Sequence, residues 1–187
     1  MRLFTGIDLP EQQTDLLTRL LDTLRPSAAV RWSKPANLHV TTKFVGEWPE
    51  GRLPELNAAL GGMETREPFS IALSGLGWFP NPHQPRIFWA AVRGGEPLAN
   101  LAAATERALE PVGVPVESRP YTPHLTLARV PAGAAVAGLR RAVAELESTD
   151  FGTWTATGQV LYLSEPAAGG SHYSPLARFP FAGGGGR

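Results

Sequence analysis

Two of the four histidines in this 187-residue chain begin the same short pattern, a histidine followed two positions later by a threonine. The pairs are His39 with Thr41 and His124 with Thr126, and each lies in a run rich in β-forming residues. Because residues i and i+2 of a strand point to one face, each pair presents an imidazole beside a hydroxyl. If the two strands face each other across a groove, one site holds two imidazoles and two hydroxyls.

This set of groups suits the hydrolysis of a phosphodiester. One neutral imidazole can accept a proton from the attacking water, and the other, as an imidazolium, can protonate the departing alkoxide. Histidine suits both roles because its ordinary pKa, about 6.5, allows either protonation state near neutral pH. The threonine hydroxyls can hold the non-bridging phosphate oxygens. The residues alone do not decide which histidine is the acid.

Other kinds of site fit the sequence less well. A single pair of this kind on a half-buried strand would more often just bond its neighbours, but two matched pairs favour a shared site. Zinc usually takes at least three protein ligands and each strand offers one, so we expect no metal and no cofactor. The absence of cysteine excludes a thiolate nucleophile, and the chain has neither a G-x-S-x-G nucleophile elbow nor a P-loop motif.

Two cationic residues follow the paired residues along the chain. Strict alternation places Lys43 on the face of His39 and Thr41, where it could add positive charge. Arg129 is the best cationic candidate for a phosphate contact. Alternation from His124 puts Arg129 on the opposite face, so this contact requires a β-bulge or the end of the strand. We therefore treat both as candidate substrate-binding residues.

Aromatic side chains near the first motif could contact a nucleobase. Phe44, Trp32 and Trp48 are the candidates, because aromatic rings stack on single-stranded nucleic acid with little sequence preference. Packing in the core or at its rim is the alternative for each. The remaining histidines, His83 and His172, have no partner pattern, and we interpret both as surface or structural residues.

The charge balance limits how the protein can bind a polyanion. Lys plus Arg and Asp plus Glu each total 17, whereas proteins that hold nucleic acid by bulk electrostatics carry a basic excess. Any nucleic-acid contact must therefore be local. The N-terminus lacks the apolar region of a signal peptide, and no run approaches the about 18 apolar residues of a membrane helix. We expect a cytoplasmic monomer that binds no membrane.

Alternating helical and strand-like segments predict an α+β fold with mixed or antiparallel sheets, because the long apolar strands of a doubly wound parallel sheet are absent. Helices are predicted over 11–25, from Pro54 to Gly61, from Pro97 to Leu109 and from Val136 to Leu146. Strands are predicted over 2–9, 38–46, 69–79, 86–92, 114–118, 124–130, 151–163 and 172–181. We expect a single domain over 1–182 and a flexible Gly-rich tail over 183–187.

The longer sequence around the two pairs resembles a known family. Residues 31–47, RWSKPANLHVTTKFVGE, and 123–129, PHLTLAR, look like the 2H phosphoesterase superfamily, specifically its LigT-like RNA 2′,3′-cyclic phosphodiesterase branch. Supporting segments make the resemblance extend over nearly the whole chain: 2–10, 75–80, 85–89 and 173–181. Position 42 is Thr where this family commonly has Leu. Alternation points Thr42 away from the paired residues, so the departure does not put activity in doubt.

The resemblance implies a bilobal fold, with two mostly antiparallel sheets flanked by helices around a central cleft. It also implies hydrolysis of the 2′,3′-cyclic phosphate of RNA ends or small nucleotides to a 2′-phosphate. His39 would be the proton donor and His124 the proton acceptor, with Thr41 and Thr126 on the phosphate oxygens. The reverse reaction, 2′–5′ RNA ligation, would use the same histidines, because acid and base exchange roles on reversal. A nucleotide- or RNA-binding module fits less well, since a binder needs no proton-transfer groups.

Overall fold

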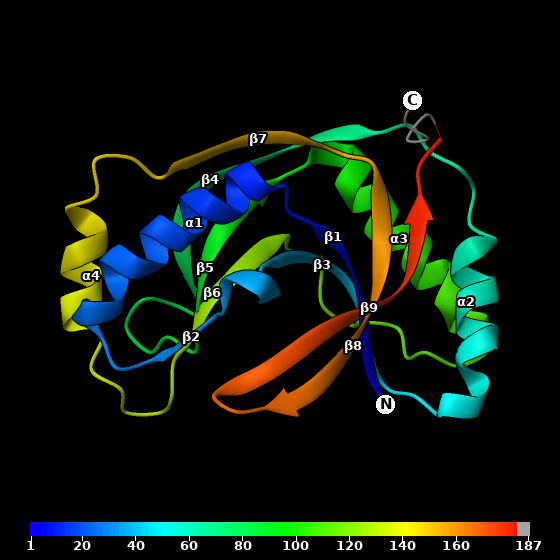
Figure 1. Cartoon of the computed structure of the whole chain (residues 1–187), viewed down its shortest axis with the longest axis horizontal. Coiled ribbons are helices and arrows are strands. Elements are labelled where there is room, and N and C mark those ends of the chain that lie inside the picture. Colours follow the sequence, from blue (N-terminus) through cyan, green and yellow to red (C-terminus); the bar gives the residue numbers. More distant parts are fainter. Residues whose placement is uncertain (183–187) are drawn as a thin grey trace.

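Two antiparallel β-sheets form the framework of the protein (Figure 1). The structure is a computed structural model, and it describes residues 1–182. The four-stranded sheet has the order β3-β1-β8-β9, with β1 at Arg2–Asp8, β3 at His39–Glu47, β8 at Gly158–Ala167 and β9 at Gly170–Pro180. The five-stranded sheet has the order β2-β6-β5-β4-β7, with β2 at Arg31–Trp32, β4 at Phe69–Phe79, β5 at Ile87–Arg93, β6 at His124–Arg129 and β7 at Asp150–Ala156. The expected α+β fold with antiparallel sheets is confirmed, and the predicted tail at 183–187 lies outside the described residues.

Helices cover one side of each sheet. The helices α1 (Glu11–Leu24) and α4 (Ala137–Ala144) lie with the five-stranded sheet, and α2 (Leu53–Gly61) and α3 (Gly95–Leu109) lie with the four-stranded sheet (Figure 1). Short 3-10 turns join the elements: η1 (Arg25–Ser27), η2 (Pro35–Asn37), η3 (Glu50–Arg52) and η4 (Glu110–Val112). Within residues 1–182, no helix is both long and apolar enough to cross a membrane.

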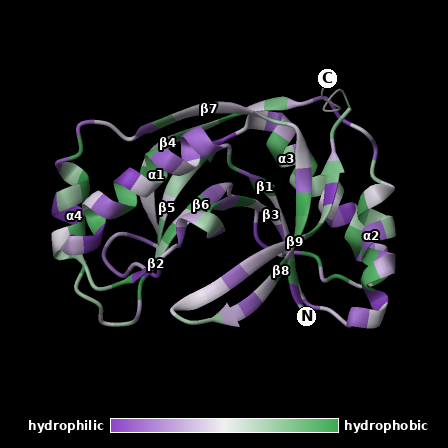
Figure 2. Cartoon of the chain, in the orientation of Figure 1, coloured by the Kyte–Doolittle hydropathy of each residue, from purple (hydrophilic) through white to green (hydrophobic). Residues whose placement is uncertain are grey.

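The apolar stripe of α1 explains how this helix attaches to its sheet. Leu17, Leu20, Leu21 and Leu24 recur at helical spacing and are buried in one core with the inner residues of the five-stranded sheet. Figure 2 shows the corresponding alternation of hydrophobic and hydrophilic positions along α1 and α4. Each fully buried leucine contributes about 1.5–3 kcal/mol, so this stripe is sufficient to fix α1 on the sheet.

The predicted strand at 114–118 is wrong, because other groups satisfy the backbone of this segment. The Pro115 carbonyl accepts a hydrogen bond from Lys43 Nζ at 2.7 Å. The Glu117 N–H donates to Glu106 Oε1, also at 2.7 Å. Side chains of β3 and α3 thus take the place that a neighbouring strand would occupy.

Two further differences concern the number of strands. The predicted strand at 151–163 is two strands, because the chain leaves the five-stranded sheet after Ala156 and enters the four-stranded sheet at Gly158. The strand β2 was not predicted, since two residues are too short to show a period. The other predicted helices and strands are confirmed, with small shifts at their ends.

A β-bulge interrupts β3 directly after the first motif. Gly6 of β1 lies opposite Thr41, but the preceding residue, Thr5, lies opposite Lys43, so Thr42 is an extra residue in β3. Two consecutive side chains of β3, those of Thr42 and Lys43, are therefore buried. The Thr42 hydroxyl lies 2.7 Å from the Thr5 hydroxyl, away from the motif histidine, as expected from the alternation.

The strand β6 has the same irregularity at the equivalent position. Trp89 of β5 lies opposite Thr126, and Phe88 lies opposite Ala128, which leaves Leu127 as the extra residue. From the motif histidine onward, β3 and β6 share one order of burial: half-buried, buried, half-buried, buried, buried and exposed. The two motif strands are thus bent in the same way.

The bulge in β3 makes the expected placement of Lys43 wrong. Instead of sharing the face of His39 and Thr41, this side chain is buried on the opposite face. Its ammonium group donates to Glu106 Oε1 at 2.7 Å and to the Pro115 carbonyl at 2.7 Å. Lys43 therefore ties β3 to α3 and to the loop before β6.

We expect Glu106→Gln to lower the free energy of unfolding by about 3 kcal/mol, because it leaves the buried Lys43 ammonium without a compensating charge. The double change Lys43→Met with Glu106→Leu removes both charges and should lose less stability than Glu106→Gln alone. Urea denaturation followed by tryptophan fluorescence measures both. A double variant that is less stable than Glu106→Gln would contradict this role for the ion pair.

Candidate active site

The two motif strands contact each other, and each presents its histidine and threonine on one side. His39 and Thr41 on β3, and His124 and Thr126 on β6, are half-buried, while the residue between each pair is fully buried. The alternation predicted for each motif is therefore present in the structure. We call the surface formed by these four side chains the motif face.

Hydrogen bonds from two loops hold β3 and β6 beside each other, although the strands belong to different sheets. Ser33, in the segment that leads into β3, donates its N–H to the Leu127 carbonyl and its hydroxyl to the Thr126 carbonyl, each at 2.8 Å. Tyr121, just before β6, donates its hydroxyl to the Thr41 carbonyl at 2.8 Å. Each motif strand is thus fixed by the loop that precedes the other.

The same hydrogen bond orients both imidazole rings. His39 Nδ1 lies 2.6 Å from the Asn37 carbonyl oxygen, and His124 Nδ1 lies 2.8 Å from the Thr122 carbonyl oxygen. Because a carbonyl oxygen only accepts, Nδ1 must carry the proton in both rings. Proton exchange is left to Nε2 in both rings, which in His39 lies 2.9 Å from the Thr41 hydroxyl. Each Nε2 can therefore act as a base when neutral and as an acid when charged.

The surroundings of His39 act on its charge in both directions. Burial lowers the pKa of His39 below its ordinary value, and the positive charges of His124 and Arg129 lower it further. The hydrogen bond to the Asn37 carbonyl and the negative charge of Asp8 raise it. Burial is the largest of these effects, so the pKa of His39 is lowered overall.

The surroundings of His124 contain no comparable negative charge. Burial lowers the pKa of His124, the hydrogen bond to the Thr122 carbonyl raises it, and the charge of Arg129 lowers it. Asp8 thus favours the charged form of His39, and no carboxylate is among the groups that shift the pKa of His124.

Aromatic rings pack against both histidines. The ring of His39 lies 4.6 Å from that of Phe4 and 5.3 Å from that of Tyr173. The ring of His124 meets Phe79 edge to face, with centroids 5.0 Å apart. These contacts limit rotation of the imidazoles and keep water from one side of each ring.

After its bulge, each motif strand has one exposed side chain, three residues beyond the motif threonine. Arg129 is exposed at the end of β6, and its charge lowers the pKa of both histidines. Phe44, at the equivalent position in β3, is 59% exposed, and its ring lies 6.3 Å from that of Phe4. The bulge that Arg129 required is present, and its contact with phosphate stays a prediction, as does base stacking on Phe44.

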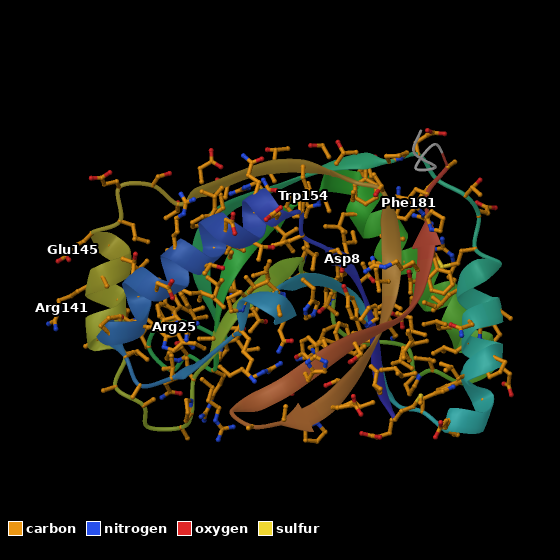
Figure 3. All side chains as sticks on the ribbon, in the orientation of Figure 1. Asp8, Arg25, Arg141, Glu145, Trp154 and Phe181 are labelled. Carbon is orange, nitrogen blue, oxygen red and sulfur yellow. The ribbon has the colours of Figure 1, made fainter. Side chains whose placement is uncertain are left out.

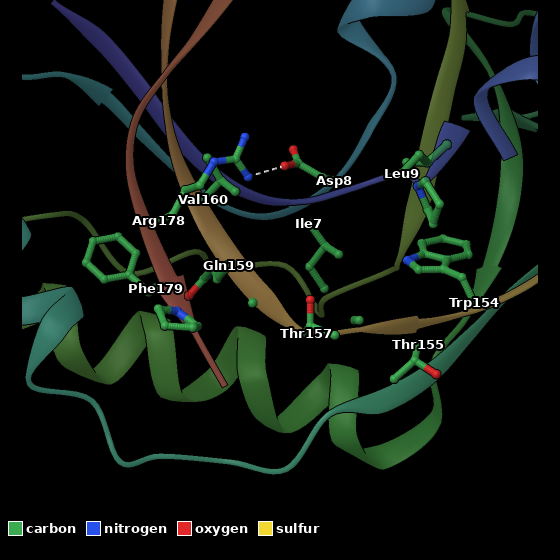
Figure 4. Close-up of a pocket in the computed structure, with 14 residues that line it drawn as sticks. Ile7, Asp8, Leu9, Trp154, Thr155, Thr157, Gln159, Val160, Arg178 and Phe179 are labelled. Carbon is green, nitrogen blue, oxygen red and sulfur yellow. Dashed lines mark hydrogen bonds and ion pairs between the residues drawn. The ribbon is translucent and has the colours of Figure 1, made fainter. Parts of the chain in front are cut away.

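Asp8, which sequence reasoning did not single out, lies directly opposite His39 in the pairing of β1 with β3. Its carboxylate forms an ion pair with Arg178 of β9, marked by the dashed line in Figure 4. The pair borders a cavity of about 390 Å³ that Trp154 also lines. None of the four motif residues lines this cavity, so we treat it as separate from the motif face.

Arg31 is the second charged residue that sequence reasoning missed. It lies in the two-residue strand β2, directly opposite Arg129 of β6. Side chains of directly opposite residues point to the same face of a sheet, so Arg31 extends the motif face beyond Arg129. No local pattern in the sequence singles out Arg31, because its position opposite Arg129 follows only from the strand pairing.

The other aromatic and histidine candidates do not reach the motif face. Trp48 is buried in the core beneath α2, and Trp32 packs against the buried Phe88, with ring centroids 6.3 Å apart. Burial makes base stacking on Trp48 wrong, and for the half-buried Trp32 the contact with Phe88 favours packing. His83 and His172 are exposed, as expected for surface residues.

Comparison with known sequences gives one consistent family. A family model described as LigT like phosphoesterase matches residues 7–89 and 92–173. An RNA 2′,3′-cyclic phosphodiesterase of Methanothermobacter thermautotrophicus is 33% identical over 181 residues, which covers 96% of this chain and 98% of that protein. A protein of the same description from Thermus thermophilus is 36% identical over 197 residues, which covers 100% of this chain and 93% of that protein.

Comparison with solved structures agrees. The crystal structure of the Thermus thermophilus protein TT0787 superposes with a TM-score of 0.82 at 31% identity, covering 98% of this chain and 99% of that one. The crystal structure of E. coli LigT complexed with 3′-AMP gives a TM-score of 0.80 at 25% identity, covering 97% of this chain and 98% of that one. The similarity in fold thus extends over both sheets.

We expect NMR titration to give pKa values below 6.5 for both His39 and His124, because burial disfavours their charged forms. Asp8→Asn removes a negative charge beside His39 only, so it should lower the pKa of His39 further and leave that of His124 unchanged. An equal shift at both histidines would contradict the assignment of Asp8 to His39.

Proposed function

The chain belongs to the LigT-like phosphoesterase family, and we propose that it hydrolyses the 2′,3′-cyclic phosphate of RNA ends to a 2′-phosphate by two-histidine acid–base catalysis. One observation carries the mechanism: both Nδ1 atoms donate to backbone carbonyls, which leaves two Nε2 atoms for proton transfer. The relatives that share 33% and 36% identity with nearly the whole chain support the substrate class.

The reaction needs one proton removed and one proton supplied. His124 Nε2 takes a proton from water, and the water oxygen forms a bond to phosphorus. The bond between phosphorus and the ribose O3′ breaks, and His39 Nε2 donates its proton to O3′. The product carries a 3′-hydroxyl and a 2′-phosphate, and the net change is the addition of one water. Solvent then takes the extra proton from His124 and returns one to His39.

The remaining groups of the motif face stabilise the charge that develops on the phosphate. The hydroxyls of Thr41 and Thr126 donate to its non-bridging oxygens, and the guanidinium of Arg129 adds charge-assisted hydrogen bonds. Thr41 Oγ1 lies 2.9 Å from His39 Nε2, so its hydroxyl is placed beside the nitrogen that donates the proton. Phe44 offers an exposed ring on which the terminal base can stack.

Asp8 supports the assignment of His39 as the acid. A general acid must hold a proton before the reaction, and the carboxylate opposite His39 favours the imidazolium. His124 has no such neighbour among the groups that shift its pKa, so the neutral form suits its role as base. All four motif residues lie within residues 1–182, and we propose that this part of the chain is a single functional unit that acts as a monomer.

We expect His39→Ala and His124→Ala each to lower kcat by about 10²–10⁴-fold on a 2′,3′-cyclic mononucleotide in EDTA, because each removes one proton-transfer group. His83→Ala and His172→Ala change exposed histidines that have no assigned role in proton transfer, and both variants should keep full activity. Phosphorus NMR should identify the product as the 2′-phosphate. A 3′-phosphate product, or full activity in either motif variant, would refute the mechanism.

We further expect a bell-shaped dependence of kcat/KM on pH with its maximum below pH 6.5. The active enzyme needs one charged and one neutral histidine, and burial lowers the pKa of both. The fraction of enzyme with one proton shared between the two rings therefore rises as the pH falls from neutral toward these pKa values. A rate that increases steadily from pH 6 to pH 9 would contradict this expectation.

A further inference from the structure

Arg31 and Arg129 form a pair of like charges within the five-stranded sheet. They lie directly opposite each other in the pairing of β2 with β6, where Cβ atoms are about 5 Å apart. Both side chains are exposed. Across residues 1–182, neither guanidinium takes part in a side-chain hydrogen bond or a salt bridge. Like charges in this position are destabilising, so an anion bound between or beside them would relieve the repulsion.

Both guanidinium groups project from the motif face. Trp32, the neighbour of Arg31 in β2, lies opposite Ala128 and packs its ring against the buried Phe88. Since successive side chains alternate, Arg31 points to the other side of the sheet, where Arg129 lies. The effect of the Arg129 charge on the pKa of His39 and His124 connects this pair to the catalytic groups.

The two arginines differ in their distance from the histidines along the sheet. Arg129 is part of the motif strand β6, whereas Arg31 lies on β2, the edge strand of the sheet. A 2′,3′-cyclic phosphate carries one negative charge, and Arg129 is the cation nearer to it. Arg31 is therefore available to bind a second anion beyond the reacting phosphate.

RNA supplies a second anion at the required position. The nucleotide that carries the cyclic phosphate is joined to the one before it by a phosphodiester, whereas a free cyclic mononucleotide has no other phosphate. Two long arginine side chains from adjacent strands can contact consecutive phosphates of one strand. The neutral overall charge of the chain agrees with such a local arrangement, because only two cations are needed.

We propose that Arg31 binds the phosphodiester on the 5′ side of the terminal nucleotide, so that the site prefers RNA ends over free cyclic nucleotides. This inference rests on the proposed function, which places the cyclic phosphate at the histidines and Arg129. In this arrangement the RNA strand leaves the site over β2, the exposed edge of the five-stranded sheet.

The test compares adenosine 2′,3′-cyclic phosphate with the adenosine dinucleotide that ends in the same cyclic phosphate, which adds one adenosine on the 5′ side and the phosphodiester that joins it. The wild type should have the higher kcat/KM on the dinucleotide. Arg31→Met should lower kcat/KM on the dinucleotide by about tenfold, as expected for loss of a charge-assisted contact, and leave the mononucleotide unchanged. Arg31→Lys should recover part of the preference.

Salt dependence gives a second readout that a structural defect would not produce. Loss of one phosphate contact to a single strand should flatten the plot of log kcat/KM against log salt by about 0.7 for the dinucleotide. Arg141→Met is the matched control, because Arg141 is exposed on α4 and points outward at the far end of the molecule (Figure 3). This control should change neither the preference nor the slope.

The outcomes separate this inference from the proposed function. A wild type that hydrolyses both substrates equally well, or an Arg31→Met variant that loses the same factor on both, would overturn the role of Arg31 and leave the proposed function standing. A wild type that hydrolyses neither substrate would overturn the proposed function itself.

Discussion

One hydrogen bond, made twice, determines what the candidate site can do. Each motif histidine donates Nδ1–H to the carbonyl oxygen two residues earlier in the chain, at Asn37 and at Thr122. In the other tautomer a ring lone pair would face the lone pairs of the carbonyl, which is unfavourable at these distances. The backbone thus fixes the tautomer of both rings, and every proton transfer in the proposed reaction follows from the position of Nε2.

The sheets supply the rest of the arrangement through their register. The motif strands belong to different sheets, yet Ser33 and Tyr121 bond each strand to the loop before the other. The matching bulges in β3 and β6 then determine on which face of each strand the residues after the motif place their side chains. The same irregularity buries Lys43 in an ion pair with Glu106 and leaves Arg129 beside the histidines. Fold stability and site charge therefore depend on the same two bulges.

Local periodicity was enough to predict most of the fold and the shared face of the histidine and threonine in each motif, because i and i+2 on a strand share a face whatever surrounds them. It failed where tertiary contacts decide. The expected face of Lys43 was wrong because a bulge depends on the partner strand, and the 114–118 segment is held by side chains of β3 and α3. Asp8 and Arg31 were missed because only strand pairing shows what lies opposite them.

The central claim is that His39 and His124 present Nε2 to one phosphate. It is tested most directly by two-bond ¹H–¹⁵N NMR of histidine-labelled protein, with and without inorganic phosphate as the probe. The account predicts that both neutral rings carry hydrogen on Nδ1 and that phosphate shifts the Nε2 resonances of both together. Hydrogen on Nε2 in either neutral ring, or a response to phosphate at only one of the two, would contradict it.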